Sequence, residues 1–244
     1  GYCSDAFAVL GPHAGEKGEW EVRLFLPQAS AASVIVDKTS HTAERVHPKG
    51  VFVCRLRGSL RRDYRVSIEL PGGHKIETDD PYRFSPVLPS FDLHLHAEGT
   101  GWEAQRMLGA HRIEFEGASG VRFAVWAPGA EVVTVTGDFT EWDERRLPMR
   151  RRDGGIWELF VPGLRVGALY KYCVKTRGGT FTLRSDPYGY HAEVAPKTAS
   201  VVYDLTQYRW SEGDAGWMKQ RAETDQLKQP MSVYEVHLES WMRH

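Results

Sequence analysis

The sequence predicts an all-β protein made of two tandem immunoglobulin-like β-sandwich modules, joined by short helices and followed by a lone strand. Two observations lead to this prediction. Short segments rich in apolar and β-branched residues alternate with polar positions at a period of two, and Gly and Pro turns separate them. The order of motifs along the first half of the chain then recurs along the second half. A repeat of about 100 residues is too long for a solenoid, whose units have about 20–50 residues.

The composition excludes several classes of function. The chain has 244 residues and a net charge of −1 without a basic block, so we expect no nucleic-acid partner. Its three cysteines lie far apart without metal-ligand spacing, which indicates reduced thiols, a cytoplasmic location and no bound metal. We find no signal peptide, no apolar run that could span a membrane, and no glycine motif of a nucleotide cofactor.

The first module, assigned with its linker to residues 1–106, begins with a short helix. Ser4 or Asp5 is its expected N-cap, and Gly11 its expected C-cap. Gly72 and Gly73 predict a tight hairpin. The expected strands are residues 19–26, 33–37, 51–57, 63–70 and 74–78.

The second module, assigned to residues 107–212, repeats these features. Its expected strands are residues 121–128, 132–136, 156–160 and 170–176, after a short helix at 102–108. The corresponding pairs are His13 and His111, Gly72 and Gly178, and Asp80 and Asp186. We therefore predict two copies of one small domain.

The last segment, residues 213–244, reads as a linker followed by the start of another domain. A polar helix is expected at 216–227, and Pro230 ends it. Residues 231–238 alternate like a strand, but no later sequence pairs with them. We expect this unpaired edge to be disordered or to pair with another copy of the chain.

Several motifs carry a resemblance to a known family. Gly-Asp-Phe-Thr-Glu-Trp at 137–142, Tyr-Lys-Tyr at 170–172 and Ser-Asp-Pro-Tyr at 185–188 resemble the starch- and glycogen-binding modules of carbohydrate-binding family 48. The tandem arrangement and Val-Tyr-Glu-Val-His-Leu at 233–238 are similar to bacterial 1,4-α-glucan (glycogen) branching enzymes, whose first barrel strand the tail resembles.

The resemblance implies a role in glycogen biosynthesis. The whole protein would be a glycosyltransferase of the glycoside hydrolase family 13 type, which transfers an α-1,4-glucan segment to a 6-hydroxyl and forms α-1,6 branches. Its catalytic carboxylates would lie beyond residue 244, on a barrel in cis, so no catalytic residue is expected here and the chain alone should be inactive. The implied partner is α-glucan, as glycogen or maltooligosaccharides.

The resemblance also implies the glucan-binding residues. Trp142, an aromatic in a polar loop, would lie under a sugar ring, and Lys171 would donate to a hydroxyl. Strand alternation places Lys171 on the face opposite Tyr170 and Tyr172. Phe181, after the second hairpin, is the candidate second ring. We expect the chain to bind α-glucan weakly and to position glucan chains.

Two alternatives stay open. Trp142 can be read instead as a cap on the sandwich edge, and Lys171 as a solvated strand residue. The chain would then be a purely structural scaffold of a branching, debranching or trehalose-forming enzyme. The first module has no aromatic in the corresponding loop, residues 37–42, so we expect that module to serve as a spacer.

The remaining polar and aromatic motifs have structural interpretations. Asp79 and Asp80 point to opposite faces of an extended chain and form a turn. Tyr188 and Tyr190, next to Asp186 and Pro187, are expected to form a turn that packs on the neighbouring domain. His94 and His96 could share one strand face as metal ligands, but no cysteine or acidic ligand lies at useful spacing, so a surface linker is favoured. Trp126 and Trp157 are expected in core or interdomain packing, and the charged runs 144–146 and 150–152 are expected on solvated faces.

Overall fold

The computed structural model describes residues 5–15 and 18–237, and it confirms the all-β class with few and short helices. The described residues up to Leu205 form one compact unit that holds both modules, and those from Thr206 onwards form another. No helix in the described part of the chain combines the length and apolar character needed to cross a membrane.

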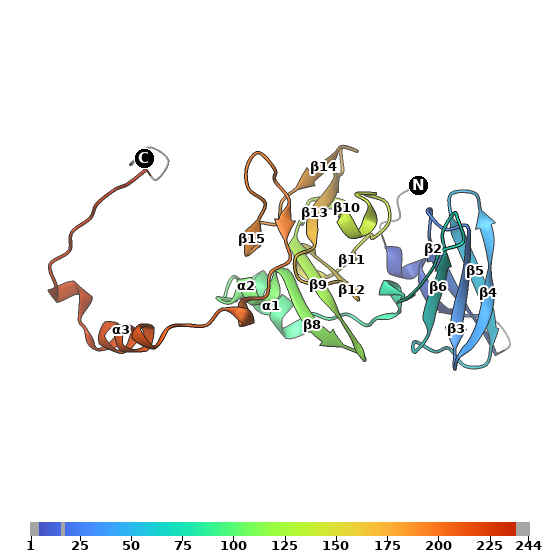
Figure 1. Ribbon diagram of the computed structural model, residues 1–244, viewed down its shortest axis with the longest axis horizontal. Helices are drawn as coiled ribbons and strands as arrows, with labels where there is room; N and C mark the ends of the chain where they lie inside the picture. The colour runs from blue at the N-terminus through green and yellow to red at the C-terminus, as the bar shows by residue number, and fades with distance from the viewer. Residues whose placement is uncertain (1–4, 16–17, 238–244) are drawn as a thin grey trace. The chain divides into compact units, whose positions relative to one another are not determined.

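The first module is a sandwich made by one continuous seven-stranded sheet in the order β1-β2-β5-β4-β3-β6-β7 (Figure 1). Strand β4 joins its two layers, because residues 39–43 pair with β3 whereas residues 44–47 pair with β5. The strands are β1 (Gly11–Ala14), β2 (Glu19–Phe25), β3 (Ala31–Val36), β4 (Thr39–His47), β5 (Val51–Arg57), β6 (Arg65–Glu69) and β7 (Lys75–Asp79). The core between the layers contains Trp20, Val22, Val34, Phe52, Tyr64 and Val66.

The start of this module corrects the prediction of a helix that ends at Gly11. The helix is a single 3-10 turn, η1 (Ala6–Ala8), and Asp5 is its N-cap because its carboxylate accepts a hydrogen bond from Ala8 N over 3.2 Å. Ser4 lies outside the described residues. Gly11 instead begins β1 with φ +85°, and a Cβ there would lie 2.6 Å from Tyr82 O. Glycine is therefore required for close packing of β1 on the Asp-Pro-Tyr turn.

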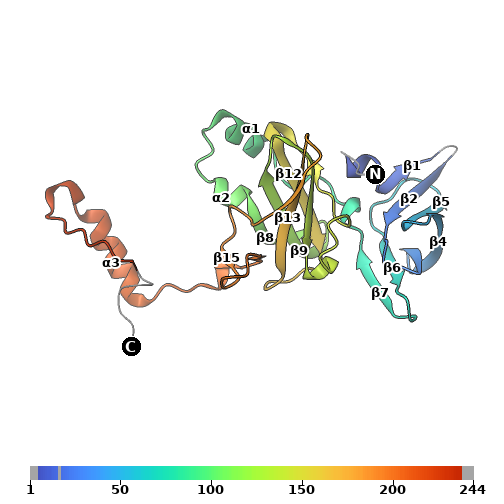
Figure 2. The ribbon, with the colours of Figure 1, turned by 90° about the horizontal axis from the view of Figure 1, so that it is seen from above.

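The second module consists of two separate sheets packed face to face (Figure 2). One has the order β11-β12-β9-β8; the other has the order β10-β13-β16-β15, with β14 paired to the free part of β13. The strands are β8 (Gly109–Phe115), β9 (Ala118–Trp126), β10 (Ala130–Gly137), β11 (Arg150–Arg151), β12 (Ile156–Pro162), β13 (Leu169–Thr176), β14 (Phe181–Arg184), β15 (His191–Ala192) and β16 (Ser200–Val201). Short 3-10 turns η3 (Asp138–Thr140) and η4 (Asp153–Gly155) follow β10 and β11.

The join between the modules covers the outer face of β9 and β12, so that every residue of β12 is buried. It contains η2 (Pro81–Arg83), α1 (Ser90–Glu98) and α2 (Ala104–Met107). Leu88, Leu93 and Leu108 pack there against Ala124 and Ile156. His94 and His96, read as a surface linker, lie on α1 and not on a strand, and His94 Nε2 is 3.2 Å from Glu98 Oε1.

Residues of both modules share one apolar cluster. Phe7 meets Tyr82 edge to face at a centroid distance of 5.0 Å, and the Arg150 guanidinium lies 3.6 Å from the Phe7 ring centre. The Tyr82 hydroxyl donates to Pro148 O over 3.2 Å. These contacts explain why the two sandwiches belong to one compact unit.

The unit from Thr206 onwards contains little regular structure. After η5 (Leu205–Gln207), helix α3 (Glu212–Glu223) begins four residues earlier than predicted, because Asp214 Oδ2 accepts hydrogen bonds from the backbone and hydroxyl of Ser211, both over 2.7 Å. A 3-10 turn, η6 (Gln226–Lys228), follows. Residues 231–237 form no strand, because no described segment pairs with them, and Val233 is 83% exposed. Leu238 lies outside the described residues.

Candidate functional site

The outward face of the sheet formed by β10, β13 and β14 gathers two of the three predicted glucan-binding residues. Tyr170 and Tyr172 of β13 point into the core, so Lys171, Cys173 and Lys175 point outward. Phe181 of β14 pairs with Lys175 and lies on the same face. At about 3.4 Å per residue, Phe181 stands about 14 Å along the strand from Lys171.

The loop that carries Trp142 folds over this outward face. Its start is fixed by the hydroxyls of Thr136 and Thr140, which lie 2.9 Å apart and are both buried. Glu141 and Trp142 then adopt left-handed backbone conformations with φ +54° and +60°, which turn the chain sharply. The Trp142 side chain remains 40% exposed. The loop therefore holds a partly exposed ring beside the sheet.

A contact further along the loop shows which face it covers. Cys173, which lies between Lys171 and Lys175 on the outward face, donates its thiol hydrogen to Glu144 Oε2 over 3.2 Å. Burial, followed by the hydrogen bond to Glu144, raises the pKa of Cys173 to about 12. The thiol is thus a protonated anchor for the loop and not a nucleophile.

The Lys171 side chain is half-buried, and one hydrogen bond holds its ammonium group in place. Its Nζ donates to Thr198 Oγ1 over 2.7 Å. At the other end of the face, Lys175 Nζ lies 6.0 Å from the centre of the Phe181 ring and 2.9 Å from Glu131 Oε2. The Phe181 side chain is 38% exposed. Two partly exposed aromatic rings and two ammonium groups thus lie on or beside this face.

The first module has a different structure at the corresponding position. Asp37 and Lys38, with φ +49° and +66°, form a two-residue hairpin between β3 and β4. Asp37 pairs with Arg61, and no aromatic residue lies in the turn. A tight hairpin replaces the long loop that holds Trp142.

Several interpretations of other residues are corrected by the structure. Trp126 is not core: its side chain is 55% exposed, and its indole N–H donates to Gly154 O over 3.0 Å. Trp157 is buried, as predicted. Arg150 and Arg152 are not solvated, because they donate to the backbone carbonyls of Phe84 over 2.9 Å and Leu88 over 3.2 Å. Both arginines therefore attach the join to the second module.

The acidic pair and the tyrosine turn have structural roles. Asp79 forms an ion pair with Arg83 at 3.0 Å, whereas Asp80 is buried and accepts from Tyr64. Tyr190 donates to Gln105 O over 2.8 Å, beside α2. Among the residues that the structure describes, no group of three or more His, Cys, Asp or Glu side chains is arranged to hold a metal ion.

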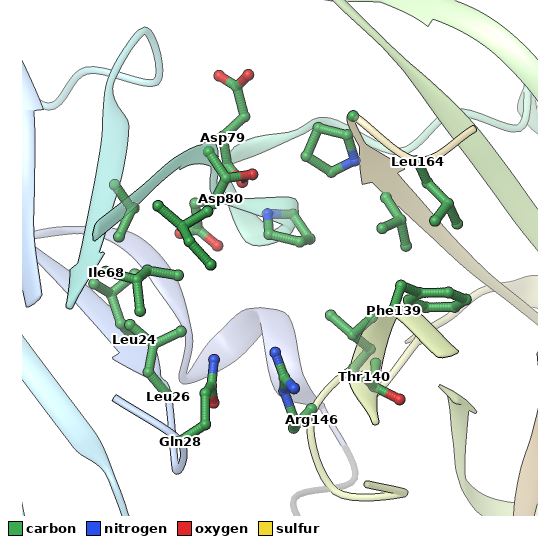
Figure 3. A pocket seen from close by; sticks show the side chains of 18 of the residues that line it. Leu24, Leu26, Gln28, Ile68, Asp79, Asp80, Phe139, Thr140, Arg146 and Leu164 are labelled. Atoms are coloured by element: carbon green, nitrogen blue, oxygen red, sulfur yellow. Dashed lines mark hydrogen bonds between the residues drawn. The ribbon is translucent and has the colours of Figure 1, made fainter. Parts of the chain in front are cut away.

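A cavity of about 380 Å³ lies where the first module meets the loops of the second (Figure 3). Leu24, Leu26 and Ile68 line it from one module, and Phe139 and Leu164 from the other. No pattern in the sequence predicts this cavity, because its walls come from segments far apart in the chain.

Two families match the chain. Residues 1–82 match the family described as alpha-1,4-glucan branching enzyme GlgB, N-terminal domain, and residues 107–189 match Carbohydrate-binding module 48 (Isoamylase N-terminal domain). Similar curated proteins are the 1,4-alpha-glucan branching enzymes GlgB of Rubrobacter xylanophilus, 48% identical over 98% of this chain and 33% of that protein, and of Paramagnetospirillum magneticum, 47% identical over 100% of this chain and 32% of that protein. The chain thus spans about a third of the length of these relatives. A solved pullulanase from Anoxybacillus sp. LM18-11 aligns with a TM-score of 0.37 and 20% identity over 82% of this chain and 28% of the pullulanase chain.

Proposed function

Because this chain belongs to the GlgB N-terminal domain family over residues 1–82 and to the carbohydrate-binding module 48 family over residues 107–189, we propose that it is the non-catalytic N-terminal part of a 1,4-α-glucan branching enzyme. The whole enzyme would transfer an α-1,4-glucan segment to a 6-hydroxyl in glycogen biosynthesis, in the cytoplasm. Its catalytic barrel would be attached in cis beyond this chain.

In this proposal the second module binds α-glucan weakly on the outward face of β10, β13 and β14. The observation that carries the proposal is the presence of exposed aromatic rings and a positioned ammonium group around one sheet face. Trp142 and Phe181 would lie under the apolar C–H faces of the sugars, and Lys171 would donate to hydroxyl oxygens. Binding there would keep glucan chains near the barrel.

We propose that the first module acts as a spacer, with module boundaries at 1–106, 107–212 and 213–244. Its tight hairpin at Asp37 and Lys38 offers no ring for a sugar. The contacts of Phe7, Tyr82 and Arg150 fix this module to the second one, as a spacer requires.

A scaffold without sugar binding is the second candidate. The observation that favours it is the hydrogen bond from Lys171 to Thr198, which already satisfies one donor of the ammonium group. An ammonium group has three donors, however, so two stay available for a ligand.

Native gel electrophoresis in the presence of glycogen distinguishes the two candidates. Trp142→Ala removes a ring whose burial against a sugar would contribute about 2 kcal/mol to the free energy of binding. The variant should therefore bind glycogen about 30-fold more weakly and lose its retardation in the gel. Trp102→Ala is the matched control, because Trp102 is 90% exposed on the join and lies outside the proposed face. Absence of retardation in the wild-type chain favours the scaffold. Retardation that both variants retain would contradict the assignment of Trp142.

A further inference from the structure

The cavity between the modules has walls of two kinds. Its sides are apolar and come from β2 and β6 of the first module and from the loops after β10 and β12 of the second. At about 380 Å³ it falls within the range of about 300–1,000 Å³ that small-molecule sites occupy. Two polar side chains, Gln28 and Arg146, project into it from the same side (Figure 3).

The hydrogen-bonding capacity of these two side chains is largely unused. Gln28 Oε1 is buried and has no hydrogen-bond partner in the described part of the chain. The guanidinium of Arg146 donates no hydrogen bond to a described residue, and burial lowers the pKa of Arg146 although the charges of Glu141 and Asp143 raise it. Buried polar groups in folded proteins are nearly always hydrogen-bonded, so the unpartnered oxygen of Gln28, in the same cavity as the half-buried Arg146 guanidinium, points to a ligand.

The charges around the cavity indicate a neutral ligand. Its lining contains four acidic residues and one arginine, namely Asp79, Asp80, Asp138, Glu141 and Arg146. This acidic excess disfavours an anion such as phosphate. A neutral molecule with hydroxyl groups on its rim and C–H groups on its faces matches both the polar pair and the apolar walls.

We propose that this cavity is a second α-glucan subsite, which takes glucosyl units between the two modules. The side-chain amide of Gln28 and the guanidinium of Arg146 would hydrogen-bond to sugar hydroxyls, while Leu24, Ile68 and Leu164 contact the C–H faces. The inference rests on the proposed function and extends it, because it gives the first module a direct part in binding. It also makes binding depend on the junction of the modules.

The test is a titration of the ¹⁵N-labelled chain with maltoheptaose, followed through amide chemical shifts. We expect two groups of shifting amides, one around Lys171 and Trp142 and one around Leu24, Ile68 and Leu164. Gln28→Leu and Arg146→Met should each lower the affinity that the cavity amides report by about five-fold. The affinity that the other group of amides reports should stay unchanged. Arg145→Met is the matched control for charge, since Arg145 does not line this cavity.

Both cavity variants should fold. Gln28→Leu removes an oxygen without a partner, so the midpoint of urea unfolding should stay the same or rise. Met keeps the apolar stem length of Arg146. A fall in affinity with unchanged unfolding therefore reports a lost ligand contact and not a damaged fold.

The outcomes separate this inference from the proposed function. Shifts confined to the amides around Trp142 and Lys171 would overturn the cavity subsite and leave the proposed function standing. Shifts confined to the cavity would support the subsite and contradict the outward face. Cavity shifts caused by inorganic phosphate and not by maltoheptaose would identify an anion site and overturn the assignment to α-glucan.

Discussion

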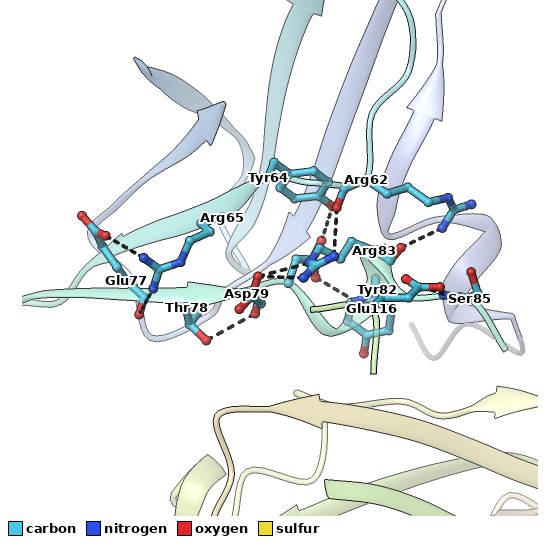
Figure 4. A network of polar contacts seen from close by, with 11 residues as sticks. Arg62, Tyr64, Arg65, Glu77, Thr78, Asp79, Tyr82, Arg83, Ser85 and Glu116 are labelled. Atoms are coloured by element: carbon cyan, nitrogen blue, oxygen red, sulfur yellow. Dashed lines mark hydrogen bonds and ion pairs between the residues drawn. The ribbon is translucent and has the colours of Figure 1, made fainter. Parts of the chain in front are cut away.

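The Tyr64 hydroxyl donates a hydrogen bond to Asp80 Oδ2 over 2.7 Å at the end of the first module. Tyr64, Asp79 and Arg83 belong to one network of polar contacts there (Figure 4). The other oxygen of Asp80 accepts from Tyr82 N over 3.0 Å. One buried carboxylate thus connects the start of β6 to the turn that leaves the module. Arg83 strengthens the same corner through its ion pair with Asp79.

The second module repeats this arrangement. Tyr170 donates to Asp186 Oδ2 over 2.7 Å, and Asp186 Oδ1 accepts from Tyr188 N over 2.8 Å. A second hydroxyl, that of Tyr172, also donates to Asp186 over 3.1 Å. The motif repeat seen in the sequence therefore corresponds to a repeated hydrogen-bonded corner, with one more donor in the second copy.

The number of donors predicts unequal effects of removing a tyrosine hydroxyl. Tyr64→Phe deprives buried Asp80 of its side-chain donor and should lower the free energy of unfolding by about 1–3 kcal/mol. Tyr170→Phe should cost less, because Tyr172 still donates to Asp186. Urea unfolding followed by tryptophan fluorescence measures both. Equal losses would show that the extra donor does not stabilise Asp186.

Asp80 also predicts a pH dependence of stability. Burial raises the pKa of Asp80 from 3.8 to about 6, against the lowering effect of its hydrogen bonds. Between these values the folded chain binds the proton more tightly than the unfolded chain, so the free energy of unfolding falls as the pH rises from about 4 to 6, by up to about 3 kcal/mol. Above pH 6 the contribution of Asp80 should be constant.

Asp80→Asn isolates this contribution. The amide oxygen can still accept from Tyr64, but the side chain no longer titrates. The pH profile of the variant should therefore be flatter than that of the wild-type chain between about pH 4 and 6. Burial raises the pKa of Asp186 in the same direction, so a residual slope is expected in the variant. Parallel profiles for the two proteins would contradict a raised pKa at Asp80.

A buried ion pair between Arg152 and Glu158 predicts that the stability of the join between the modules depends on Arg152. Glu158 is 1% exposed, accepts from Leu88 N over 2.8 Å and forms an ion pair with Arg152. Arg152→Met leaves the carboxylate without this partner and should lower the free energy of unfolding by about 3 kcal/mol. Arg151→Met, at the exposed neighbouring position, should change it by less than about 0.5 kcal/mol. Similar urea midpoints for the two variants would contradict the role of Arg152.

The strands were predictable where one face is buried. The prediction failed where that pattern of alternating burial was absent or misleading. β4 was missed because its only buried residue is Ala43. α1 was read only as a surface linker, although Gly99 ends a helix there in the left-handed conformation. The repeat itself was predictable because both corners need the same Asp-Pro-Tyr residues.

The candidate site was predictable only where one loop or strand carries it. Alternation along β13 was enough to place Lys171 opposite Tyr170 and Tyr172, and the structure has this arrangement. The cavity was not predictable, because Gln28 and Arg146 belong to different modules and line the same cavity only after both have folded. Whether Trp142, Lys171 and Phe181 bind sugar stays a prediction.

Lys171 provides a graded test of that prediction. Lys171→Met keeps the apolar stem but removes the donors, so it should weaken maltoheptaose binding on the outward face by about 1 kcal/mol, or about five-fold. Lys75→Met is the matched control, because Lys75 is an exposed lysine paired with Glu69 at 3.5 Å in the first module. Amide shifts of β13 during titration measure the affinity.

Since Lys171 also donates to Thr198, Thr198→Val separates the two roles of Lys171. The variant removes the protein partner and leaves the ammonium donors free, so the affinity should be kept. Equal weakening by Lys171→Met and Thr198→Val would show that Lys171 acts by holding the loop at Thr198 and not by contacting sugar.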